Sequence, residues 1–165
     1  RAYTADREHV SWLYTQRKAA EREFEVLEAL YPGVSVPQPI DHNRHAIVME
    51  KVPGVELGKA KLAAEQVTGV LELILRELQS AFEAGYVHAD ISEYNVFVAE
   101  SGVTLFDWPQ AVPTDHENST ELLKRDIDNI TNYFERKYPG KVGSVAVEAV
   151  VEAIEAGEFE ALRVE

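Results

Sequence analysis

With 165 residues, 45% of them apolar, the chain is long enough for one domain with a packed core or for part of a larger protein. The absence of cysteine excludes disulfides and thiolate metal sites. Because the chain has no membrane-spanning apolar run and no N-terminal signal segment, we expect a cytoplasmic protein. The net charge of −13 predicts an acidic, solvated surface, as in salt-loving organisms, and disfavours general nucleic-acid binding, although a local basic patch could still bind RNA.

Apolar residues at helical spacing predict a first long helix over residues 8–31, which the Pro-Gly pair at positions 32–33 would end. The residues that recur on its apolar face are Val10, Leu13, Tyr14, Ala20, Phe24, Leu27 and Leu30. Two short strand-like runs follow, over residues 38–41 and 46–50, and the polar stretch between them predicts a hairpin. A Val-Pro-Gly break at residues 52–54 ends this pattern.

Periodicity predicts two further long helices, over residues 62–84 and 118–137, and a short one over residues 144–156. Gly85 directly follows the first of these helices and fits its C-terminal cap. The side chains that we expect to be buried from the two long helices are Leu71, Leu75, Leu78, Phe82, Leu122, Ile127, Ile130 and Phe134. Mixed helices and short strands predict an α+β fold.

The most informative stretch lies between the two long helices, over residues 88–110. It reads His-Ala-Asp-Ile-Ser-Glu-Tyr-Asn, then two apolar runs at 96–98 and 103–106, then Asp-Trp-Pro-Gln. A Glu-Ser-Gly turn separates the two runs, so they predict a β-hairpin. The open end of that hairpin should bring Asn95 and Asp107 together.

These residue types suit phosphoryl transfer. The amide oxygen of Asn95 and the carboxylate of Asp107 are hard ligands of the kind that Mg²⁺ prefers, with Mn²⁺ as an alternative, and phosphate oxygens can complete the shell. Asp90 would then be free to orient or deprotonate a nucleophile. The competing interpretation is that all three are turn and cap residues without a chemical role.

The order His-x-Asp, Asn, Asp over residues 88–107 resembles the catalytic and metal-binding loops of protein kinases. The segments Ser92–Asn95 and Asp107–Gln110 resemble more closely the RIO family of atypical protein kinases, and most closely its Rio2 branch. Further matching segments are Ser11–Tyr14, Ala19–Phe24, Pro37–Pro39, Asn43–Ala46, Met49–Glu50 and Arg125–Ile127. The resemblance therefore spans nearly the whole chain.

The resemblance implies a protein-kinase-like (RIO) fold. Residues 1–52 would form a partial N-lobe with helix C and the hairpin, and residues 53–165 would form the hinge and a reduced C-lobe with the catalytic and metal loops. A Gly-rich loop, the nucleotide-binding lysine and a winged-helix domain would precede Arg1. We therefore expect a fragment that binds Mg-ATP loosely and turns over weakly or not at all by itself.

The resemblance also implies catalytic roles. Asp90 would align the attacking oxygen and accept its proton, and Asn95 and Asp107 would bind Mg²⁺. Glu23 would pair with the nucleotide-binding lysine, although its spacing alone favours one more exposed glutamate. His88 would brace the catalytic loop rather than transfer protons.

Nucleotide contacts follow from the same resemblance. Met49 resembles the gatekeeper, and Glu50 and Val52 lie where the hinge would receive adenine through backbone groups. Ser92 could contact phosphate through its hydroxyl. A buried strand methionine and a simple loop hydroxyl are the alternatives for Met49 and Ser92. Asp126 would either hold the catalytic loop or be a surface charge.

The implied function is a Rio2-like serine kinase or ATPase that uses Mg-ATP in small ribosomal subunit maturation, with an aspartyl-phosphate at Asp107. Its small-molecule partner would be ATP. The full-length protein would bind the pre-small ribosomal subunit, with its pre-rRNA and ribosomal proteins. No membrane partner is expected. A small-molecule phosphotransferase of the aminoglycoside or choline kinase type and a noncatalytic ribosome-assembly scaffold are the alternatives. The sequence leaves the oligomeric state and the phosphoryl acceptor open.

Overall fold

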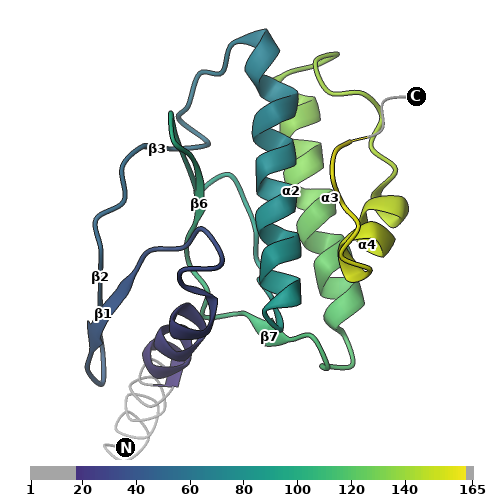
Figure 1. Cartoon of the computed structure of the whole chain (residues 1–165). Coiled ribbons are helices and arrows are strands. Elements are labelled where there is room, and N and C mark those ends of the chain that lie inside the picture. Colours follow the sequence, from purple (N-terminus) through teal and green to yellow (C-terminus); the bar gives the residue numbers. More distant parts are fainter. Residues whose placement is uncertain (1–17, 163–165) are drawn as a thin grey trace, which may run out of the picture.

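The fold places a layer of helices on one side of a small hairpin sheet. The computed structural model describes residues 18–162, and Figure 1 shows helices α2, α3 and α4 on one side of strand β6. The N-terminal helix and the β1–β2 hairpin lie on the other side. Among the described helices, none is both long and apolar enough to cross a bilayer.

The N-terminal helix is described over residues 18–30. This part of the predicted helix is confirmed, whereas residues 8–17 lie outside the described range. Val26, Leu27 and Leu30 are buried, so the inner face of the helix packs on the core. The helix ends at residue 30, one residue before the predicted Pro-Gly stop.

The other predicted helices are confirmed with shorter bounds. Helix α2 spans Val67–Glu83 and is preceded by a 3₁₀ turn over Ala64–Gln66. Helix α3 spans Ser119–Lys137 and helix α4 spans Val147–Glu155. Each of these three helices contacts the other two.

Seven short strands form three small antiparallel sheets among the described residues. The strands are β1 Pro39–His42, β2 Ile47–Met49, β3 Val55–Glu56, β4 Tyr86–Val87, β5 Val96–Ala99, β6 Gly102–Leu105 and β7 Val112–Pro113. Strand β1 pairs with β2, β5 lies between β3 and β6, and β4 pairs with β7. Both predicted hairpins are therefore confirmed, and the structure adds the two-residue strands β3, β4 and β7.

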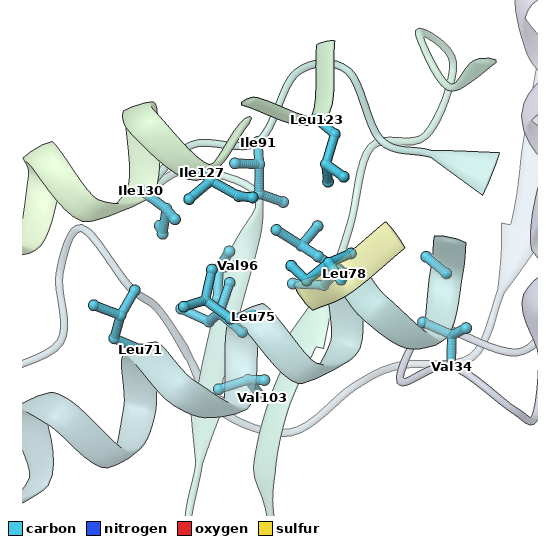
Figure 2. Close-up of a cluster of buried hydrophobic side chains, with 14 of the residues drawn as sticks. Val34, Leu71, Leu75, Leu78, Ile91, Val96, Val103, Leu123, Ile127 and Ile130 are labelled. Atoms are coloured by element: carbon cyan, nitrogen blue, oxygen red, sulfur yellow. The ribbon is translucent and has the colours of Figure 1, made fainter. Parts of the chain in front are cut away.

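The core is centred on α2. Figure 2 shows Leu71 and Leu75 of this helix between Ile127 and Ile130 of α3 on one side and Val103 of β6 on the other. These side chains are fully or almost fully buried. Burial of this kind stabilises by about 1.5–3 kcal/mol for each large apolar side chain. The hairpin that joins the two predicted metal ligands is thus anchored directly to the core.

Two core predictions need correction. We expect Phe82 and Leu122 to be buried, but both are only half-buried, and Leu123, next to Leu122, is 1% exposed. Helical spacing could not choose between two adjacent leucines, since either continues the apolar stripe. The proposed division of the chain at residues 52 and 53 stays a prediction.

Candidate active site

The catalytic loop begins where α2 has ended. Gly85 follows the helix with a φ of +99°, a conformation that suits glycine and turns the chain away from the helix axis. Strand β4 then leads into His88. The next residue, Ala89, has a φ of +67°, which costs a non-glycine residue about 1–2 kcal/mol. Surrounding contacts must therefore hold the loop in this shape.

Asn95 connects the three predicted site residues. Its Oδ1 accepts the Ser92 N–H at 2.8 Å, and its Nδ2 donates to the backbone oxygen of Asp90 at 2.7 Å. Its own backbone oxygen accepts the Phe106 N–H at 2.7 Å. Since Asp107 follows Phe106 directly, the structure brings residues 90, 95 and 107 together at the open end of the β5–β6 hairpin. Their convergence is confirmed, and their chemical roles stay predictions.

His88 braces the loop from inside. The ring is fully buried and lies 4.5 Å from the ring of Trp108, centroid to centroid. Its Nδ1 accepts the Asp90 N–H at 3.2 Å, so Nε2 carries the proton and donates to the Phe106 oxygen at 2.7 Å. Burial lowers the pKa of His88, so the ring is neutral around pH 7. The expected bracing role is confirmed.

Asp126 of α3 holds the backbone of the same loop. It is fully buried, and its carboxylate accepts the N–H groups of Ala89 at 2.7 Å and Ile91 at 3.0 Å. Burial raises the pKa of Asp126 to about 6, against the lowering effect of these two bonds and of Arg125. Arg125 also donates from Nη2 to the Ala89 oxygen at 2.6 Å. Asp126 therefore holds the loop, and the surface-charge alternative is wrong.

Asp90 and Asp107 differ from their buried neighbours because both are exposed. The Asp90 N–H and the oxygen of Phe106, the residue before Asp107, both bond to the His88 ring, so the two acids start from backbone next to the same ring. Asp107 has a φ of +56°, in the left-handed region that aspartate tolerates better than most residues. The scaffold is thus buried while two acidic groups face solvent, where a phosphate could reach them.

Glu23 joins this site from the N-terminal helix. The residue is half-buried, and its Oε1 accepts the Trp108 N–H at 3.1 Å. Burial raises the pKa of Glu23 and the nearby Asp107 raises it further, while the bond from Trp108 opposes both. Glu23 is therefore not a simple exposed glutamate. Its pairing with a lysine stays a prediction.

The predicted nucleotide contacts receive less support from the geometry. Met49 and Val52 are half-buried and Glu50 is exposed, with the Glu50 N–H donating to the Gln38 oxygen at 2.9 Å. Within residues 18–162, no hydrogen bond links this hinge segment to the catalytic side chains. The Ser92 Oγ accepts the Tyr94 N–H at 3.3 Å, so this hydroxyl serves the loop turn and retains its own proton for a further bond.

The donor set fits a hard divalent cation. The described residues contain no group of three or more His, Cys, Asp or Glu side chains placed to hold a metal. Asn95 Oδ1 uses one lone pair on Ser92 and has a second, and the Asp107 carboxylate is exposed. Two such oxygens suit Mg²⁺ only when substrate phosphates and water supply the remaining ligands.

A well-formed cavity lies away from this site. It has a volume of about 620 Å³ and lies between α4 and the segment after it, with Val150, Phe159 and Leu162 in its lining. None of the predicted site residues lines it. This cavity therefore says nothing about the candidate site, whose function must be argued from its side chains.

The chain has close relatives among characterised families. The RIO domain family model matches residues 1–147. The RIO-type serine/threonine-protein kinase Rio2 of Methanocaldococcus jannaschii is 47% identical over 141 residues, which cover 82% of this chain and 52% of that protein. Serine/threonine-protein kinase rio2 of Dictyostelium discoideum is 36% identical, over 84% of this chain and 27% of that protein. The chain thus spans about half, or less, of the length of these relatives.

Solved structures agree with this assignment. The Rio2 kinase of Chaetomium thermophilum, in an ADP/Mg²⁺-phosphoaspartate complex, matches with a TM-score of 0.70 at 25% identity, over 91% of this chain and 48% of that chain. The bifunctional kinase-methyltransferase WbdD matches at 19% identity with a TM-score of 0.60, over 90% of this chain and 37% of that one, which shows the shared fold alone. This chain therefore belongs to the RIO family, has its protein-kinase-like α+β fold and resembles its Rio2 members.

Proposed function

We propose that this chain forms the phosphoryl-transfer part of a Rio2-type serine/threonine kinase or ATPase that uses Mg-ATP. The observation that carries the proposal is the set of hydrogen bonds at Asn95, which joins the backbone of Asp90 to the residue before Asp107. Serine/threonine kinase relatives at 47% and 36% identity support it, as does the complex of a relative with ADP and Mg²⁺.

Each side chain has a role in this proposal. Asp90 is exposed and accepts the proton of the attacking group. Asn95 and Asp107 hold Mg²⁺, which supplies positive charge to the transferred phosphoryl group when bound. Glu23 orients a lysine of the full protein, and backbone groups near Met49, Glu50 and Val52 receive adenine. Ser92 donates its hydroxyl proton to a phosphate oxygen.

A finer proposal concerns the acceptor. A carboxylate oxygen of Asp107 attacks the γ-phosphorus of ATP, the bond between that phosphorus and the β,γ-bridging oxygen breaks, and ADP leaves. Water then attacks this phosphorus, a water proton passes to Asp90, the bond from phosphorus to the Asp107 oxygen breaks, and phosphate leaves. The phosphoaspartate in the Chaetomium thermophilum Rio2 complex supports this route. In the cell, we place such a cycle in cytoplasmic maturation of the small ribosomal subunit.

Phosphate release by the full-length protein tests the main proposal. We expect Asp90→Asn and Asp107→Asn to reduce release from Mg-ATP by about 10²–10⁴-fold, because each removes a group that acts on the reacting atoms. Asp115→Asn is the matched control, since it removes an acid that is also exposed and lies in the turn before α3. Equal release by all four proteins would favour the scaffold alternative, and efficient transfer to aminoglycosides would favour the small-molecule alternative.

A labelling experiment tests the finer proposal. With ATP carrying ³²P in the γ position, we expect a protein label that hydroxylamine removes, because hydroxylamine cleaves acyl phosphates. Asp107→Asn should abolish this label. A label that resists hydroxylamine and survives Asp107→Asn would show that the phosphoryl group is on a hydroxyl instead.

A further inference from the structure

Ser35 lies at a junction of three elements. Its N–H donates to Glu77 Oε2 of α2 at 2.7 Å, and its hydroxyl donates to the Val103 oxygen of β6 at 2.6 Å. Its backbone oxygen accepts the Leu105 N–H at 2.9 Å. Ser35 therefore uses its backbone donor, its backbone acceptor and its hydroxyl, all on partners distant in sequence.

Glu77 is the unusual member of this junction. It is half-buried on a helix whose core-facing residues are otherwise apolar, and burial raises the pKa of its carboxyl while the Ser35 N–H opposes that effect. Placing a carboxylate there costs desolvation free energy, which the strong charge-assisted bond to Ser35 offsets. Ser35 itself is half-buried, between the buried residues Val34 and Val36.

The junction lies on the path between the two halves of the candidate site. On one side, the helix that carries Glu23 ends at residue 30, shortly before Ser35. On the other side, Leu105 ends β6 and is followed within two residues by Asp107. The bond from the Trp108 N–H to Glu23 then closes a ring of contacts through the N-terminal helix, Ser35 and β6.

We propose that Ser35 and Glu77 form a latch that fixes Glu23 and Asp107 relative to each other. They are positioning residues, because neither belongs to the group of side chains at the open end of the hairpin. The expected effect of the latch on turnover rests on the proposed function. Its effect on the relative position of Glu23 and Asp107 does not. Glu77 ties Ser35 to α2, and α2 also packs against β6, so loss of the latch lets the segment after the N-terminal helix shift against both elements. A displacement of about 1 Å can reduce turnover by up to about 10²-fold.

The test compares the full-length protein with four variants, each carrying a single substitution. Glu77→Ala removes the acceptor, Glu77→Gln keeps an oxygen for the Ser35 N–H, and Ser35→Ala removes the bond to Val103. Glu72→Ala is the matched control, because Glu72 is also half-buried on α2 and accepts a backbone N–H, that of Leu162, at 3.0 Å. We measure kcat and KM for ATP, and hydrogen exchange of the Trp108 amide, well below each unfolding temperature.

We expect Glu77→Ala to lower kcat at least about tenfold with a smaller change in KM, and to speed exchange of the Trp108 amide. Ser35→Ala should show a smaller effect in the same direction, while Glu77→Gln and Glu72→Ala should stay near the wild type. Equal losses in Glu77→Ala and Glu72→Ala, or unchanged Trp108 exchange in Glu77→Ala, would overturn the latch. Absence of turnover in the wild type would instead contradict the proposed function, and Trp108 exchange would still decide on the latch.

Discussion

The catalytic loop and the β1–β2 hairpin are built in opposite ways. Around the loop, His88 and Asp126 are fully buried and Asn95 is 5% exposed, and all three hydrogen-bond to backbone atoms. In the hairpin, by contrast, Ile40 is 60% exposed and Val48 is 52% exposed. The hairpin depends mainly on its own backbone pairing.

This difference indicates where the fold tolerates change. The catalytic loop contains a left-handed Ala89 and must aim charged groups, so buried side chains specify its shape from several directions. The hairpin needs only paired backbone and a turn, in which the Asn43 side chain accepts the N–H groups of His45 and Ala46. Side-chain substitutions should therefore be costly near the loop and nearly neutral on the exposed face of the hairpin.

The largest expected effect is that of Asp126→Ala. It leaves the N–H groups of Ala89 and Ile91 buried without an acceptor and removes the support of a strained backbone. We expect the free energy of unfolding to fall by about 3 kcal/mol or more. Urea denaturation, followed by circular dichroism, measures the loss.

Asp128→Ala, on the same helix but half-buried, should cost less than about 1 kcal/mol. Equal losses of stability in the two variants would show that the catalytic loop does not depend on the buried carboxylate of Asp126.

A smaller effect is expected from pH. The pKa of Asp126 is raised from 3.8 to about 6, so between these values the folded protein binds a proton that the unfolded chain has released. The stability contributed in this way is fully present below about pH 4 and is lost as the pH rises through about 6. We expect the free energy of unfolding of the wild type, relative to Asp126→Asn, to fall by about 1–3 kcal/mol over this range and to stay constant above it.

The comparison with Asp126→Asn is needed because His88 acts with the opposite sign. Burial lowers the pKa of His88, so its contribution is present above about pH 6.5 and is lost as the pH falls. His88 is present in both proteins, and its effect cancels in the difference. Parallel stability curves for the two proteins from pH 4 to 7 would show that Asp126 titrates normally.

The same contrast explains what the sequence could predict. Asn95 and Asp107 are joined by a short hairpin, so two apolar runs and one turn are enough to predict that they meet. The helices are predictable because their apolar stripes are long. The two-residue strands β3, β4 and β7 have no detectable alternation, since they form only when a distant strand supplies partners.

The supporting contacts were harder to predict for a related reason. Asp126 contacts residues 35 and 37 positions away, and Ser35 meets Glu77 across 42 positions. On its helix, Asp126 is one acid within a charged stretch, and Glu77 is one of several polar residues near Arg76 and Gln79. Nothing local distinguishes a buried acceptor from a solvated charge, because the difference is set by tertiary packing.

The smallest expected effect uses the same substitution in the two regions. Val96→Thr places a hydroxyl at a fully buried position directly after Asn95, whereas Val48→Thr places it on the exposed face of β2. Threonine has the shape of valine and favours strands, so backbone pairing should survive in both variants. The buried hydroxyl should cost about 1–3 kcal/mol, and the exposed one less than about 0.5 kcal/mol. Urea midpoints of the two variants compare them directly, and equal losses would mean that the hairpin face is covered by something that the described residues do not include.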